Sequence, residues 1–197
     1  MEITYTKGET MECIRFEKVR DGKYLKNYEI TYLNRQGKEK KYEIVSRRNL
    51  NGVEDLGAKP SGVSIVATCQ DKLLLLHEFR MGVNRSIYNL CAGMLELGET
   101  IEDCIARELM EETGLRLIRI KKILPPSFAA VAISDTTTYI AFAEVEGEPN
   151  SGGNSANEEI HAELYSRKQV KALLETAEFS SRAQMAAYFF SEFMDFN

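Results

Sequence analysis

Residues 93–115, which read GMLELGETIEDCIARELMEETGL, contain the clearest helix signal in the chain. The pattern predicts a helix over residues 101–113, because the signals at its two ends agree. Thr100 is a typical N-cap, and Asp103 stands three residues on, in the capping-box position. Gly114 follows the last turn, where a left-handed residue is favoured. We therefore expect a loop that leads into a well-capped helix.

Three glutamates of this helix share one face. With Glu108 at the origin of a helical wheel, Glu111 and Glu112 fall on either side of it, within an arc of about 100°. Like charges at these spacings repel one another, so a positive partner is expected. Arg107 can reach Glu111 or fold back to Glu99, but one guanidinium does not balance four acids. Divalent cations that prefer carboxylate oxygens, Mg²⁺ or Mn²⁺, fit the cluster better.

An acidic helix face in solvent is the ordinary interpretation of such glutamates, but a longer pattern competes with it. Gly93, Glu99 and the run from Arg107 to Leu115 match every specified position of the Nudix hydrolase box, G-x5-E-x7-R-E-U-x-E-E-x-G-U, with U aliphatic. Residues 93–115 thus resemble this family. The resemblance implies an α/β fold, the Nudix α/β/α sandwich with a mixed sheet, here preceded by a small N-terminal antiparallel β-unit.

The resemblance also implies a role for each residue of the box. Glu99 and Arg107 would brace one another and hold the loop against the helix. Metal ligands would be the carbonyl of Ala92 and the carboxylates of Glu108, Glu111 and Glu112. In the family, bound cations neutralise a pyrophosphate and lower the pKa of an attacking water. The implied reaction is hydrolysis of a nucleoside diphosphate linked to another group X.

Evidence on X lies outside the box. Residues 74–80 and 88–99 resemble the run "EQYR … E-L-P-A-G-x-x-E-x-G-E" of ADP-ribose pyrophosphatases and their nucleotide-sugar relatives, in which an N-terminal β-unit swaps over a partner subunit. This resemblance implies Tyr24 as a stacking aromatic, with Arg47 or Arg48 and Arg80 as anion-binding residues. It also implies a homodimer that converts ADP-ribose to AMP and ribose 5-phosphate. In the competing interpretation, Tyr24 is an ordinary aromatic of a strand, and Arg47 and Arg48 are surface residues with no role in binding.

Three departures limit the substrate prediction. Asn89 stands where that subgroup usually has Glu, Cys91 where it has Pro, and Thr136, in the predicted loop 125–136, where it has a catalytic Glu. The general base is therefore open between Asp135, one of Glu158 and Glu159, and a box glutamate. Another substrate stays an alternative: a nucleotide sugar, a dinucleotide, a coenzyme A derivative or a nucleoside triphosphate. So does a non-catalytic module that binds a nucleotide.

The remaining elements are predicted from alternation and helical spacing. Strands are expected over residues 24–33, 41–45, 62–68, 72–78 and 139–145, and helices over 167–177 and from residue 180 or 181 onward. A connection rich in glycine precedes residue 62. We place a boundary there, between an N-terminal β-unit of residues 1–57, which we expect to dimerise, and a Nudix domain of residues 58–197.

Composition excludes several classes of function. The 197 residues are 44% hydrophobic, which is enough for a real core. A net charge of −5 gives no basic field for nucleic-acid strands. No apolar run approaches the roughly 20 residues that cross a bilayer, and the N-terminus does not look like a signal peptide. Four scattered cysteines without a CxxC pair favour reduced thiols in a cytoplasmic protein.

Overall fold

The computed structural model describes residues 11–150 and 159–193, and these form two compact units. One unit comprises the described residues up to Pro60 together with Ser127–Thr138. The other comprises Ser61–Pro126 together with the described residues from Tyr139 on. The smaller unit therefore draws on the chain on both sides of the predicted boundary at residue 57.

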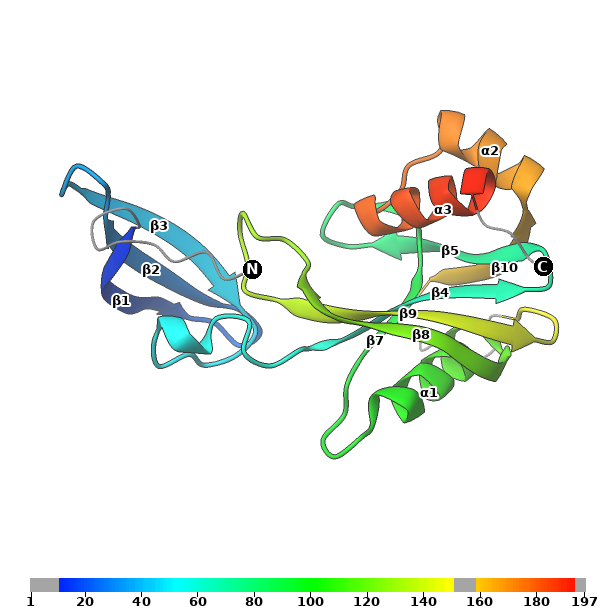
Figure 1. Cartoon of the computed structure of the whole chain (residues 1–197), viewed down its shortest axis with the longest axis horizontal. Helices are drawn as coiled ribbons and strands as arrows, with labels where there is room; N and C mark the ends of the chain where they lie inside the picture. Colours follow the sequence, from blue (N-terminus) through cyan, green and yellow to red (C-terminus); the bar gives the residue numbers. More distant parts are fainter. Residues whose placement is uncertain (1–10, 151–158, 194–197) are drawn as a thin grey trace. The chain divides into compact units, whose positions relative to one another are not determined.

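The smaller unit is built on a three-stranded antiparallel sheet in the order β1-β2-β3 (Figure 1). Its strands are β1 (Glu12–Asp21), β2 (Lys26–Leu33) and β3 (Glu39–Ser46), and a short 3-10 helix, η1 (Val53–Asp55), follows them. Tyr28 and Ile30 of β2 and Ile44 of β3 are buried together with Leu50. The Tyr28 hydroxyl accepts a 2.8 Å hydrogen bond from the backbone N–H of Leu50, which ties the segment after β3 to this core.

The segment 127–138 belongs to the same unit because it is bonded to β3. The backbone N–H of Val45 donates to the carbonyl of Ile133 at 2.8 Å, and the Tyr42 hydroxyl donates to the carbonyl of Ala132 at 2.7 Å. Residues far apart in sequence thus belong to one small unit.

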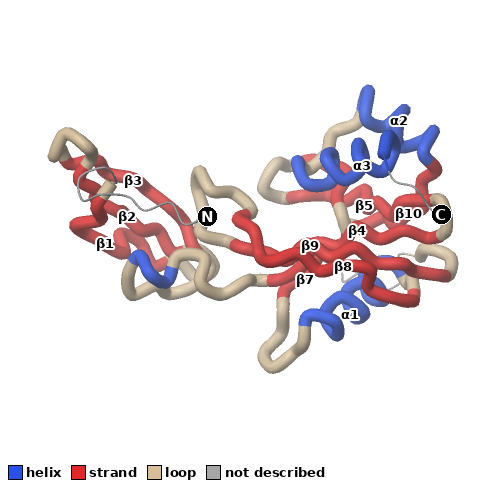
Figure 2. Tube along the Cα trace, viewed as in Figure 1, coloured by secondary structure: helices blue, strands red, loops and turns tan. Residues whose placement is uncertain are grey.

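The larger unit is a sheet between two helical layers (Figure 2). The seven strands run in the order β10-β5-β4-β9-β8, with β6 paired to β5 and β7 paired to β4. The strands are β4 (Gly62–Cys69), β5 (Lys72–Arg80), β6 (Arg85–Asn89), β7 (Cys91–Met94), β8 (Arg116–Phe128), β9 (Thr137–Glu146) and β10 (Ile160–Ser166). Helix α1 (Ile101–Thr113) lies on one face, and α2 (Arg167–Thr176) and α3 (Ser181–Phe193) lie on the other.

Strand β5 shows why the sheet is covered on both faces. Leu74 and Leu76 enter the core beneath α1, whereas Leu73 and Leu75 enter the core beneath α2 and α3. Side chains of a strand alternate between faces, so an uninterrupted apolar run requires cover on both sides. The predicted α/β/α sandwich is therefore confirmed. Within the described part of the chain, no helix is long and apolar enough to cross a membrane.

Helix α1 begins and ends where its capping signals predict. The Thr100 hydroxyl oxygen accepts a hydrogen bond from the backbone N–H of Asp103 at 3.1 Å. Gly114 has a φ of 68°, and its N–H donates to the carbonyl of Met110 at 3.0 Å. Apolar Ile105 and Leu109 are fully buried against the sheet. The helix therefore holds its acidic residues at a fixed position beside β7.

Candidate active site

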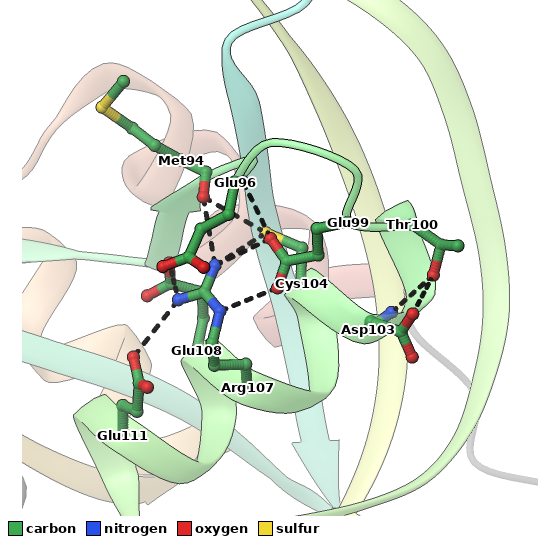
Figure 3. A network of polar contacts seen from close by, with 9 residues as sticks. All are labelled: Met94, Glu96, Glu99, Thr100, Asp103, Cys104, Arg107, Glu108 and Glu111. Carbon is green, nitrogen blue, oxygen red and sulfur yellow. Dashed lines mark hydrogen bonds and ion pairs between the residues drawn. The ribbon is translucent and has the colours of Figure 1, made fainter.

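Arg107 links the loop before α1 to three carboxylates of the box (Figure 3). Its Nε and Nη2 atoms donate to the two oxygens of Glu99 at 2.7 and 3.0 Å, which is the forked geometry of a strong charge-assisted pair. Its Nη1 donates to Glu108 at 2.8 Å and to Glu111 at 3.2 Å. The pairing with Arg107 lowers the pKa of Glu99 to about 2. These four residues of the loop and the helix thus form one charge network.

The same network fixes the loop. Arg107 Nη2 also donates to the carbonyl of Met94 at 3.1 Å, and Glu99 accepts a 3.0 Å hydrogen bond from the backbone N–H of Glu96. Gly98 adopts a φ of 82°, a region that a side chain would strain. The loop is therefore held against α1 at both of its ends.

Gly93 lets the backbone of β7 approach the helix closely. A Cβ atom at this position would overlap the carboxylate of Glu108. Glu108 is 8% exposed, and burial raises the pKa of its carboxyl group. The box glycine thus leaves the space beside the strand that the Glu108 side chain occupies.

Glu112 faces β7 as well. Its Oε2 accepts a 3.2 Å hydrogen bond from the backbone N–H of Ala92. Burial raises the pKa of Glu112 to about 7, and the nearby charges of Glu108 and Glu78 act in the same direction. At neutral pH this carboxyl group is therefore only partly ionised.

The donor chemistry of this cluster suits a hard divalent cation. Among residues 11–150 and 159–193 no group of three or more acidic, histidine or cysteine side chains is gathered as a metal site, since Glu108 and Glu111 turn toward Arg107. Two observations nevertheless favour a cation here. Glu112 is a half-buried carboxylate with a raised pKa, and Gly93 leaves the backbone of residues 92–93 beside the box acids.

A cleft of about 280 Å³ lies next to the box in the larger unit. Its lining residues are Glu78, Phe79, Arg80, Met81, Gly82, Glu112, Glu159 and Ile160. The structure thus brings Arg80, a predicted anion-binding residue, into one cleft with Glu112. Glu159, a candidate base, lies there too, while Glu158 is outside the described residues. Sequence reasoning missed Glu78, whose one signal is an acid shortly after the apolar run Leu73–Leu76.

The other predicted site residues lie in the smaller unit. Tyr24 is 67% exposed, with Lys23 Nζ 5.0 Å from the centre of its ring, and Arg47 is exposed. Arg48 and Asp135, for which separate roles are predicted, are brought together: Arg48 Nη2 lies 3.3 Å from Asp135 Oδ2, and the aspartate side chain is only 3% exposed.

The chain is similar in sequence to several known proteins. The chain is 30% identical to the ADP-ribose pyrophosphatase of Bacillus subtilis over 134 residues, which cover 68% of this chain and 65% of that protein. It is 29% identical to the ADP-ribose pyrophosphatase of Escherichia coli (strain K12) over 127 residues, which cover 60% of each chain. It is 25% identical to the putative nudix hydrolase 2 of Caenorhabditis elegans over 142 residues, which cover 70% of this chain and 62% of that protein. The matches therefore span less than two thirds of these relatives.

A solved structure and a family model also match this chain. A crystal structure of an ADP compounds hydrolase has the same fold, with a TM-score of 0.69, 21% identity and 94% coverage of both chains. The NUDIX domain model matches residues 58–188, which is well over half of the sequence. By this match, the chain belongs to the Nudix family.

Proposed function

We propose that the protein is a Mg²⁺-dependent pyrophosphatase that hydrolyses a nucleoside diphosphate linked to a group X. ADP-ribose is the proposed substrate, with AMP and ribose 5-phosphate as products. The observation that carries the proposal is the position of Glu112, which belongs to the box and at the same time lines a cleft with Arg80. The names of the Bacillus subtilis and Escherichia coli relatives support the choice of ADP-ribose.

The proposed metal site uses the acids around α1. Glu108, Glu111 and Glu112, with the carbonyl of Ala92, would hold Mg²⁺ or Mn²⁺. When bound, the cation supplies an activated water and a polarised phosphorus. The pair of Glu99 and Arg107 keeps the loop against the helix, which fixes the positions of these ligands.

The proposed substrate contacts beyond the box are Arg80, Tyr24 and one of Arg47 and Arg48. Arg80 offers a guanidinium to the phosphates at the mouth of the cleft. Tyr24 and one of Arg47 and Arg48 would act in a homodimer, in which the N-terminal unit of a second copy contributes to the site. All four cysteines are free thiols, which agrees with a protein that acts in the cytoplasm.

For the general base we propose Asp135, with Glu159 as the competing candidate. Asp135 is held by Arg48 in the smaller unit, whereas Glu159 lines the cleft beside Glu112. Asp135→Asn and Glu159→Gln separate the two, because only loss of the base removes turnover while leaving substrate binding near normal. If both variants keep turnover, the base is Glu158 or a box glutamate.

A substrate panel tests the proposed function. The wild-type protein with Mg²⁺ is incubated with ADP-ribose, a nucleotide sugar, a dinucleotide, a coenzyme A derivative and a nucleoside triphosphate, and the phosphate-containing products are identified. We expect the highest kcat/KM for ADP-ribose. Higher activity on another compound would make that compound the substrate in place of ADP-ribose. Binding without turnover of any compound would favour a non-catalytic nucleotide-binding module.

A further inference from the structure

Glu78 is a buried carboxylate at the edge of the cleft. The residue is 5% exposed, although it lies near the end of β5, where Phe79 and Arg80 are exposed. A buried charge is costly unless hydrogen bonds or an opposite charge compensate it. The partners of Glu78 therefore indicate what holds it there.

One oxygen of Glu78 is held from inside the fold. Its Oε1 accepts a 2.6 Å hydrogen bond from Nδ2 of Asn89, the last residue of β6. The Oδ1 of Asn89 accepts hydrogen bonds in turn, from the hydroxyl of Ser180 at 2.6 Å and from the backbone N–H of Leu90 at 3.0 Å. The Asn89 amide is thus fixed by residues that lie just before α3 and just after β6, and it fixes the carboxylate.

The other oxygen of Glu78 faces Arg80. Arg80 Nη1 lies 3.2 Å from Oε2 of Glu78, and the arginine side chain is 56% exposed while that of Glu78 is 6% exposed. Residues two apart on a strand project from the same face, so both side chains reach the same cleft. One guanidinium nitrogen engages the carboxylate, and the others stay available to a ligand.

The contact between Glu78 and Arg80 matters because other carboxylates also line the cleft. Glu112 and Glu159 also line it, so a guanidinium without a fixed partner has other carboxylates to approach. The side chain of Arg is long and loses much rotamer freedom when a ligand immobilises it. An arginine already held by a rigid acid avoids part of that loss.

We infer that Glu78 is a positioning residue, which holds Arg80 in the orientation that binds the diphosphate of the substrate. The chain of contacts runs from Ser180 through Asn89 to Glu78 and then to Arg80. This also accounts for the amide at position 89: a glutamate there would set a second carboxylate against Glu78. The inference rests on the proposed function, because it names a determinant of the same site.

A double-mutant cycle tests the inference. Glu78→Gln, Arg80→Ala and the double variant are compared with wild type for KM and kcat on ADP-ribose. Glutamine keeps an oxygen for Asn89 and removes the charge from Arg80. We expect Glu78→Gln to raise KM about fivefold with kcat within about twofold, and Arg80→Ala to raise KM about tenfold or more. The double variant should be no worse than Arg80→Ala alone.

Two controls separate positioning from general damage. Glu178→Gln breaks the exposed pair with Arg85, 2.7 Å away on the neighbouring strand β6, and should leave KM unchanged. Thermal unfolding of each variant reports on the fold. A Glu78→Gln variant with unchanged KM, or one that raises KM equally in the Arg80→Ala background, would overturn the positioning role.

Calorimetry with inorganic pyrophosphate keeps this inference distinct from the proposed function. We expect both Glu78→Gln and Arg80→Ala to weaken pyrophosphate binding. A wild-type protein that binds pyrophosphate through Arg80 but hydrolyses no diphosphate would refute the function and keep the positioning role. If ADP-ribose is hydrolysed but the effects of the two substitutions on KM are additive, the positioning role is refuted and the function stands. Equal pyrophosphate binding by all variants would also refute the positioning role.

Discussion

Glu112 links folding to pH at a single residue. Its pKa is raised to about 7 by burial, so the folded protein binds a proton there that the unfolded chain, with a pKa near 4.5, has released. When the folded state holds more protons, stability falls as pH rises. The loss begins near pH 4.5 and is complete above about pH 7.

Unfolding of the metal-free protein in urea measures this effect. Between pH 4.5 and pH 8 the wild type should lose up to about 3 kcal/mol relative to Glu112→Gln, which has no proton to release at this position. Added Mg²⁺ should stabilise the wild type at pH 8 and stabilise the variant less. Parallel pH profiles for the two proteins would show that Glu112 is not a strained carboxylate.

At the scale of elements, helix α1 depends on its caps because its acids repel one another. The Thr100 hydroxyl satisfies the N–H of Asp103 at 3.1 Å, one of the four N–H groups at a helix start that have no partner within the helix. Thr100→Ala should reduce the free energy of unfolding by about 1 kcal/mol, measured by urea denaturation. Thr100→Ser, which keeps the oxygen, is the matched control. Equal losses in both variants would mean that packing of the methyl group, and not the cap, is responsible.

The elements that the sequence predicts well are those with local signals. Helix α1 runs over residues 101–113 as predicted, since Thr100, Asp103 and Gly114 are all within its own sequence. The predicted loop 125–136 is wrong at its start, because β8 continues to Phe128 through Pro125 and Pro126. Strand β8 ends the strand order of its sheet, and proline is tolerated on such an edge, where an N–H group need not pair.

In the candidate site, too, contacts between residues close in sequence can be predicted, whereas contacts between distant residues cannot. The spacing of the box is enough to predict that Glu99, Arg107 and Glu108 lie near each other. It cannot reveal the contact of Glu78 with Asn89, which depends on the register of β5 against β6. Nor can it pair Arg48 with Asp135, 87 positions later, because that pairing depends on the tertiary fold.

At the scale of the molecule, this Arg48–Asp135 pair joins the N-terminal sequence to the segment 127–138 of the smaller unit. Removing one partner leaves the other charge buried and uncompensated. Arg48→Met should therefore lower the free energy of unfolding by about 2–3 kcal/mol, a value reduced for the partial exposure of the arginine. Adding Asp135→Asn should recover part of the loss in urea unfolding. A double variant as unstable as Arg48→Met would exclude the buried charge as the cause.

We propose that the box acids of α1 serve metal-dependent hydrolysis. The most direct measurement is the rate of ADP-ribose hydrolysis with Mg²⁺, followed through AMP and ribose 5-phosphate, for wild type, Glu111→Gln and Glu112→Gln. Each glutamine keeps the shape of the side chain and removes a negative oxygen ligand. We expect kcat/KM to fall by at least about 100-fold in each variant. Wild-type rates in both variants would contradict it.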